Sequence, residues 1–324
     1  MLVSVLLFAV GLVLLIKGGD WFVDGATGIA KRFNLPDIVV GATVVSIGTT
    51  LPEVMVSTTG ALAGSGAMAY GNAIGSIICN TALIAAISIV CNPGPVNVKS
   101  MKTPAIFFFC SAALYCLAAY GLGTFPRWMG FVMLTIFVAY TLLTVRNGLK
   151  NPDAVEEEEE EGGKPKKLWQ ELLLLVIGAA VIAVGADLLV DHGQIIAIGL
   201  GVPETVVALL FVALGTSLPE LVTTITSLKK GRASLGVGNV IGANVFNLVL
   251  VSGVAVSLAP FDVPVENTLL DTGLNLSLVF DIPVMLGVMA LMILPAMLGK
   301  KLSRWQGIAL LGIYVAFCVC QFLL

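Results

Sequence analysis

Two copies of one hexapeptide place a glutamate inside a hydrophobic segment. Gly48-Thr49-Thr50-Leu51-Pro52-Glu53 recurs 167 residues later as Gly215-Thr216-Ser217-Leu218-Pro219-Glu220. A charged side chain at the centre of a bilayer costs about 2.5–3.5 kcal/mol on insertion scales, so an intramembrane acid is a candidate functional residue by default. Proline removes a backbone donor, and we expect each helix to break beside its glutamate and to free oxygen atoms there. The pattern predicts a cation site.

Hydroxyl and amide side chains accompany each glutamate. Two hydroxyls lie within about one helical turn of it, and the next hydrophobic segment carries Gly-Asn-x-Ile-Gly followed by an asparagine. These candidate ligands are Thr49, Thr50, Glu53 and Asn80 in the first copy and Thr216, Ser217, Glu220 and Asn247 in the second. Ligation by oxygen alone suits hard cations such as calcium and sodium and argues against zinc or copper.

The charges of the two glutamates indicate how ions would replace one another. Two carboxylates neutralise one divalent cation, whereas without a cation the like charges repel. Sodium ions or protons can therefore displace calcium, and occupancy by one class of ion excludes the other. This mutual exclusion is the physical basis of exchange.

The composition indicates an all-α polytopic membrane protein. Of the 324 residues, 58% are hydrophobic and only 11% are charged, and apolar runs recur along the whole length, so the partner of this surface is the lipid bilayer. The net charge of −3 gives no sign of a nucleic-acid partner. We expect no enzyme activity and no cofactor, because the chain has no His-Glu-x-x-His motif and no nucleophile paired with a base.

The apolar segments predict ten transmembrane helices, of which the second, third, seventh and eighth are expected to be broken. The expected spans are 3–27, 38–60, 69–91, 102–121, 127–146, 168–193, 204–227, 235–258, 276–298 and 304–323.

An acidic linker over residues 147–167 divides the chain into halves 1–146 and 168–324, each with five spans. Because five is odd, the second half must enter the membrane from the opposite side. The halves also match at the constant offset of 167, for example at Asp20 and Asp187, over more than 60 residues without a gap. Repeats of inverted topology are typical of secondary transporters, which bind their ions near the midplane between the repeats.

The basic residues predict the orientation. Fifteen lysines and arginines fall in alternate loops, and opposite them there is only Arg127. Because cytoplasmic loops carry the excess of positive charge, we expect both termini outside and the linker 147–167 in the cytoplasm. The expected location is a prokaryotic cell (inner) membrane. We read the run from Glu156 to Glu161 as a solvated, disordered segment.

The doubled motifs resemble the two alpha-repeats of the calcium/cation antiporter superfamily, in particular those of the prokaryotic sodium/calcium exchangers. The resemblance rests on residues 48–53 with 71–80 and on residues 215–220 with 238–247. It implies an antiporter that exchanges calcium for sodium by alternating access, with the first and sixth helices sliding over the other eight. The implied ligands are Glu53, Glu220, Thr49, Thr216, Thr50, Ser217, Ser76 and Asn80, with the backbone carbonyls of Ser46 and Ala213. We expect the protein to function as a monomer.

Two positions depart from the sodium/calcium branch, whose members commonly carry an aspartate at Asn247 and a serine at Ala243. The calcium site is retained, and Asn247 is kept as a candidate ligand, but the coupling ion stays open. The alternatives are a proton/calcium exchanger and a potassium-dependent sodium/calcium exchanger. Ile74-Gly75 and Ile241-Gly242 stand where proton-coupled relatives usually place a glutamate, which favours the sodium type. A cation channel is a further alternative, but it would normally place its ligands in rings around a symmetric pore.

Overall fold

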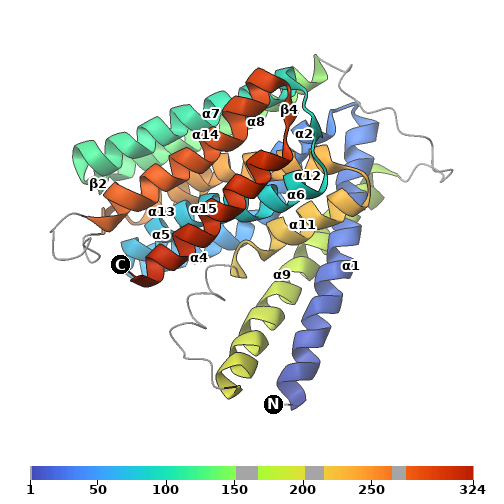
Figure 1. Ribbon diagram of the computed structural model, residues 1–324, viewed down its shortest axis with the longest axis horizontal. Helices are drawn as coiled ribbons and strands as arrows, with labels where there is room; N and C mark the ends of the chain where they lie inside the picture. Colours follow the sequence, from blue (N-terminus) through green and yellow to red (C-terminus); the bar gives the residue numbers. More distant parts are fainter. Residues whose placement is uncertain (1, 151–166, 201–214, 265–274, 324) are drawn as a thin grey trace.

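The computed structural model describes residues 2–150, 167–200, 215–264 and 275–323 (Figure 1). Within these residues, eight helices are long and apolar enough to cross a membrane, and one bent pair, Asp37–Thr49 with Leu51–Leu62, raises the number to nine. The all-α membrane class is therefore confirmed. The expected span 204–227 begins outside the described residues, so the count of ten helices stays a prediction.

The elements of the first half follow one another with short connections. In order they are α1 (Leu2–Arg32), α2 (Asp37–Val40), the π-helical η1 (Gly41–Val45), α3 (Ser46–Thr49), α4 (Leu51–Leu62), α5 (Gly66–Cys79), η2 (Asn80–Ala85), α6 (Ala86–Cys91), β1 (Gly94–Pro95), α7 (Val98–Cys116), η3 (Leu117–Leu122), β2 (Thr124–Phe125) and α8 (Arg127–Leu149).

The second half repeats the succession α5, η2, α6 of the first half as α12, η5, α13. Its described elements are α9 (Leu168–Gly199), α11 (Leu218–Lys229), α12 (Ala233–Phe246), η5 (Asn247–Val251), α13 (Ser252–Leu258), β3 (Phe261–Asp262), η6 (Ser277–Asp281), α14 (Ile282–Gly299), β4 (Lys301–Leu302) and α15 (Arg304–Leu323).

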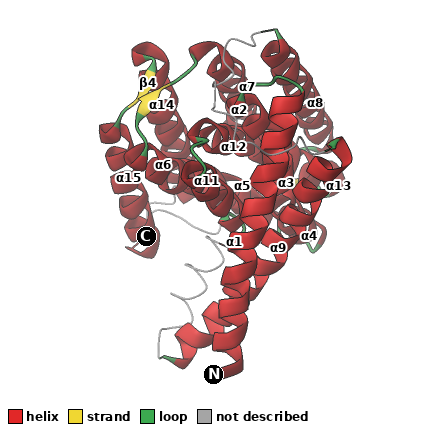
Figure 2. Cartoon of the chain, turned by 90° about the vertical axis from the view of Figure 1, so that its right-hand side faces the viewer, coloured by secondary structure: helices red, strands yellow, loops and turns green. Residues whose placement is uncertain are grey.

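Helices α1 and α9 form a pair that lies against the rest of the bundle and extends beyond it at the N-terminal end (Figures 1 and 2). Glycines allow this close approach, as is typical of helix pairs in membranes. A Cβ atom added at Gly11 would lie 2.9 Å from the carbonyl oxygen of Gly185, and one added at Gly18 would lie 3.1 Å from that of Gly178. Gly11 and Gly178 are related by the offset of 167, as are Gly18 and Gly185, so the pair packs about a local two-fold axis.

Two short strand pairs connect loops that are distant in sequence. β1 pairs with β4, and β2 pairs with β3, both antiparallel. The first pair therefore joins the connection after α6 to the one after α14, and the second joins the connection after η3 to the one after α13. This arrangement agrees with the alternation of loops between two ends of the bundle that the basic residues predict.

Helix α12 lies at the centre of the molecule, and every residue from Leu235 to Phe246 is buried. Its glycines let neighbouring backbone touch it. A Cβ atom at Gly238 would lie 2.3 Å from the carbonyl oxygen of Ile38, and one at Gly242 would lie 2.4 Å from Ser46 Oγ. Since no side chain larger than hydrogen fits there, α12 is fixed against α2 and η1.

The third and eighth spans are continuous, and each carries a π-helical segment that begins at an asparagine, Asn80 in η2 and Asn247 in η5. The expected breaks in these spans thus take the form of local π-helix, which leaves some backbone carbonyls without their usual donor. In η5 the Asn247 carbonyl accepts the Ser252 amide in place of the usual donor, and Ser252 Oγ donates to the same carbonyl at 2.9 Å. In η1, Ser46 Oγ donates in the same way to the Gly41 carbonyl at 2.8 Å.

Candidate functional site

Thr50 and Ser217 precede the two helices that carry the glutamates. At Thr50 (φ −84°, ψ −3°) the span bends by 45° between α3 and α4. Ser217 has almost the same backbone conformation, φ −89° and ψ 3°, and α11 begins at the next residue. The predicted break is therefore confirmed in the first copy. In the second copy the start of the new helix is described, and the residues before 215 are not.

Pro52 and Pro219 explain where these helices begin. Each lies in the first turn, where a backbone N–H would have no partner within the helix, so the missing donor costs nothing there. Glu53 and Glu220 occupy the same first turns. The helix N-terminus carries a partial positive charge, which stabilises a carboxylate placed beside it.

The two carboxylates are buried and have no hydrogen-bond partner among the residues that the structure describes. Both residues are 0% exposed. Several neighbouring ligand candidates share this condition. At this site the buried side chains with unpartnered polar atoms include Glu53, Glu220, Thr50, Ser217, Asn80 and Asn247. An unpaired buried polar group costs free energy, and such groups are rare in folded proteins. Their concentration on the predicted ligands fits a set of oxygen atoms arranged for cations.

The two glutamates face a common space. Their carboxylates interact electrostatically with each other, and the Glu220 carboxylate lies beside the hydroxyls of Thr49 and Thr50 from the opposite copy. Ser217 lies near Cys79, which is itself within electrostatic range of Glu220. The structure thus brings ligand candidates from both halves together, and two like charges so placed require a cation to balance them.

The π-helical segments that begin at Asn80 and Asn247 each pack against the glutamate-bearing helix of the opposite half. η2, which begins at Asn80, packs against α11, and η5, which begins at Asn247, packs against α4. Both asparagines are buried, with 0% and 1% of the residue exposed. Each glutamate helix therefore meets the asparagine segment of the other half.

The structure places the remaining ligand candidates, Ser76, Ser46 and Ala213, in three different situations. Ser76 is buried in α5, and its counterpart in α12, Ala243, is a buried residue without a hydroxyl. The Ser46 carbonyl accepts the Thr50 amide at 3.0 Å, which leaves one lone pair for an ion. Ala213 lies outside the described residues.

Asn72 and Asn239 were not among the candidates from the sequence, yet they bind two of them across the repeats. Thr49 Oγ1 donates to Asn239 Oδ1 at 3.1 Å, and Thr216 Oγ1 donates to Asn72 Oδ1 at 3.4 Å. Ser46 Oγ also lies 2.9 Å from the carbonyl oxygen and 3.3 Å from the side-chain oxygen of Asn239, so its single hydrogen has these oxygens and the Gly41 carbonyl as acceptors to choose from. The duplicated Gly-Asn pair was the signal that could have identified both asparagines.

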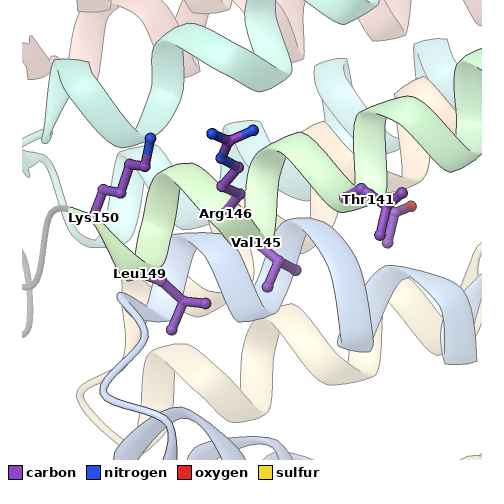
Figure 3. A pocket seen from close by; sticks show the side chains of 6 residues that line it. Thr141, Val145, Arg146, Leu149 and Lys150 are labelled. Atoms are coloured by element: carbon purple, nitrogen blue, oxygen red, sulfur yellow. The ribbon is translucent and has the colours of Figure 1, made fainter.

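The donor set differs from that of a transition-metal site. In the part of the chain that the structure describes, no three His, Cys, Asp or Glu side chains gather as they would around a metal ion. The hollow shown in Figure 3 is not the ion site either, because its lining comes from the end of α8 and the residue that follows it, and includes none of the predicted ligands. The lining residues are Thr141, Leu142, Val145, Arg146, Leu149 and Lys150.

Three acids on α1 and α9, namely Asp20, Asp24 and Glu171, have basic partners. Lys230 Nζ lies 2.6 Å from the Asp24 carboxylate and 3.7 Å from that of Asp20. Arg32 Nε lies 2.9 Å from Glu171 and so joins α1 to α9. These contacts indicate that Asp20 and Asp24 are structural residues.

The comparisons with known proteins agree with this geometry. The family model described as sodium/calcium exchanger protein matches residues 3–146 and 171–323. The chain is 30% identical to the sodium/calcium exchanger MaX1 of Methanosarcina acetivorans, with 99% of each chain covered. It is 33% identical to the uncharacterized membrane protein MJ0091 of Methanocaldococcus jannaschii, with 95% of this chain and 94% of that protein covered.

Solved structures of the sodium-calcium exchanger NCX_Mj are similar over the whole length. One of them, from crystals soaked with sodium and calcium, superposes with a TM-score of 0.77 at 30% sequence identity. The match covers 98% of this chain and 97% of that one.

Proposed function

The chain belongs to the sodium/calcium exchanger family, and from this premise we propose that Glu53 and Glu220 form the centre at which it exchanges calcium for sodium. The observation that carries the proposal is the set of buried, unpartnered oxygen atoms on both glutamates and on the residues around them. Calcium takes six to eight oxygen ligands at about 2.3–2.6 Å, and it accepts carboxylates, carbonyls and amides in flexible geometries. The proposed ligands are Glu53, Glu220, Thr49, Thr216, Thr50, Ser217, Ser76, Asn80 and Asn247, with the carbonyls of Ser46 and Ala213.

The requirement that bound cations balance the two carboxylate charges explains how this centre exchanges one ion for another. One calcium ion, or several sodium ions, compensates the two carboxylates, and the two classes of ion compete for the same oxygen atoms. Without any cation, two negative charges are buried together, which is costly. The site therefore resists changing sides while empty, and this resistance couples the outward movement of one ion to the inward movement of the other.

Alternating access needs a part of the protein that moves. The α1/α9 pair is held together by close glycine contacts and by Arg32–Glu171. It meets the rest of the bundle chiefly at α11 and α2, whereas α12 is packed on every side. This contrast supports movement of α1 and α9 as a unit over the remaining helices.

The arrangement in the membrane follows the basic residues. We place the protein in a prokaryotic cell (inner) membrane, with both termini outside and residues 147–167 in the cytoplasm, and we take residues 1–146 and 168–324 as the two inverted repeats. The transporting unit is a monomer, because both repeats, and hence both glutamates, belong to one chain.

Calcium flux in liposomes tests the proposal. Purified protein in vesicles loaded with sodium should take up radioactive calcium when external sodium is low, and uptake should stop when internal sodium is replaced by choline. Uptake that needs no counter-ion would contradict antiport and indicate a channel. Uptake driven by a proton gradient alone, or only with potassium present, would identify one of the two alternative exchangers.

A further inference from the structure

Two hydroxyl ligands depend on the opposite repeat for their orientation. Thr49 donates to Asn239, and Thr216 donates to Asn72. The two threonines are related by the offset of 167, and so are the two asparagines. The same bond is therefore made twice, each time between the broken helix of one repeat and the third helix of the other.

A hydroxyl can bind a cation only through a lone pair of its oxygen atom. Its hydrogen must then point elsewhere, toward an acceptor. A carboxylate acceptor would compete for the cation, whereas the neutral amide oxygen of asparagine accepts the hydrogen without adding charge. Groups that orient the ligands of a metal in this way typically change its affinity by about 10- to 100-fold when they are removed.

The two asparagines are held in different ways: Asn239 by packing, since its Nδ2 has no partner among the described residues, and Asn72 by hydrogen bonds. Asn239 is 0% exposed and lies between Gly238 and Gly242 on the stretch of α12 that touches α2 and η1. Asn72 directs its Nδ2 to Ser57 Oγ at 2.8 Å and to the Glu53 carbonyl at 3.3 Å. Because the nitrogen of Asn72 faces its own repeat, its oxygen is left for Thr216.

We propose that Asn72 and Asn239 are positioning residues that turn the lone pairs of Thr216 and Thr49 toward the transported cation. The inference rests on the proposed function and adds to it that each half of the ion site is completed by the other repeat. Ion affinity then depends on the contact between repeats as well as on the ligands themselves.

Double-mutant cycles with calcium as the probe test this inference. Asn239→Leu removes the acceptor at nearly constant volume, and Thr49→Val removes the donor. Equilibrium binding of radioactive calcium to the purified full-length protein should weaken about tenfold or more in Asn239→Leu. In the Thr49→Val background the same change should have no further effect beyond about twofold, because the hydroxyl it orients is gone.

The symmetry-related partner provides the matched control. Combined with Thr216→Val, Asn239→Leu should still weaken calcium binding by its full factor, since Thr216 is oriented by Asn72. A structural role would make the two factors multiply in both backgrounds, and that result would overturn the proposal. Asn239→Asp keeps an acceptor oxygen and should therefore bind calcium more tightly than Asn239→Leu does. Equal losses of calcium affinity in the two variants would also overturn the proposal.

Two further measurements keep the outcomes separate. Thermal unfolding and size-exclusion chromatography show whether Asn239→Leu folds. If it does not, the symmetry-related double-mutant cycle of Asn72→Leu with Thr216→Val decides the question, because Asn72 is only partly buried and its substitution should disturb folding less. If the wild-type protein binds no calcium, the proposed function itself fails. If the wild-type protein binds calcium, and the effects of the two substitutions on calcium affinity multiply in every double mutant, only the positioning role is contradicted.

Discussion

The two repeats build the same centre with unequal means. In both, the helix that begins at the leucine of Leu-Pro-Glu buries its glutamate, and the threonine two residues before that leucine donates its hydroxyl to an asparagine across the interface. The first repeat adds hydroxyls at Ser46 and Ser76, where the second has Ala213 and Ala243. Asn239 Oδ1 therefore lies within hydrogen-bond distance of two hydroxyls, those of Thr49 and Ser46, whereas Asn72 Oδ1 accepts that of Thr216.

This difference distinguishes the groups that are present in both repeats from the groups that are present in one repeat only. The carboxylates and their neighbouring threonines are duplicated, as a cation bound between the repeats requires. The extra hydroxyls are confined to one side, so ions that occupy positions away from the midpoint meet different ligands in the two halves. We therefore expect symmetric effects from changes at the glutamates and asymmetric effects from changes around them.

The largest effect is expected at the duplicated acids. Glu53→Gln and Glu220→Gln each remove one of the two charges that balance calcium, and each should reduce sodium-dependent calcium uptake at least a hundredfold. Uptake in liposomes measures this. The intramembrane acid Asp281, which accepts Gln321 Nε2 at 2.6 Å, supplies the control, and Asp281→Asn should stay within about twofold of the wild type. Normal exchange in either glutamine variant would refute the site.

A packing change should break the contact that joins the repeats. Gly242→Ala would place a methyl group 2.4 Å from Ser46 Oγ and 2.6 Å from the Ala42 backbone. Such overpacking costs about 1–3 kcal/mol of unfolding free energy, and it should also weaken calcium binding because η1 and α3 are displaced. Thermal unfolding measures the stability. Gly312→Ala, with nothing within 4 Å of its added Cβ atom, should be neutral or slightly stabilising; equal losses in both variants would argue against the packing account.

A substitution at Asn247 tests the effect of placing an additional negative charge in one repeat only. Asn247→Asp adds a carboxylate to the second repeat only, and it should change the sodium concentration for half-maximal exchange about tenfold, since an added charge favours every cation that enters its reach. Calcium binding should be retained. The mirror variant Asn80→Asp serves as the comparison. Identical sodium dependence in wild type and Asn247→Asp would show that this position does not contribute to coupling.

The smallest effect is expected from the missing hydroxyl. Ala243→Ser restores in the second repeat the group that Ser76 supplies in the first, and one additional neutral ligand should lower the half-maximal sodium concentration by about two- to threefold. Ser76→Ala should raise it by a similar factor. Sodium titrations of calcium uptake compare the two, and changes of the same sign in both variants would contradict the assignment.

The proposed site could be predicted from the sequence because its signals are local. A glutamate after proline in an apolar segment is unusual in itself, and its repetition in a nearly identical hexapeptide makes Glu53 and Glu220 candidates without a structure. The helical class followed from composition, and the bend at Thr50 followed from Pro52. These features depend on neighbouring residues along the chain.

The features that were not predicted depend on contacts between distant segments. Nothing in the sequence near Asn239 shows that Thr49, 190 residues away, donates to it. The π-helical segments at Asn80 and Asn247 were expected as breaks, because periodicity does not distinguish an interrupted helix from one that gains a residue per turn. Ser46 was expected to contribute its carbonyl, and its hydroxyl contact with Asn239 became visible only from the packing of α12.

The most direct test of the central claim is to locate calcium in the protein. Crystals grown in calcium, measured for anomalous scattering, should show one strong peak about 2.3–2.6 Å from carboxylate oxygens of both Glu53 and Glu220, and the peak should fade as sodium replaces calcium. A peak bound by one repeat alone, or one that sodium leaves unchanged, would contradict a shared exchange centre between the two repeats.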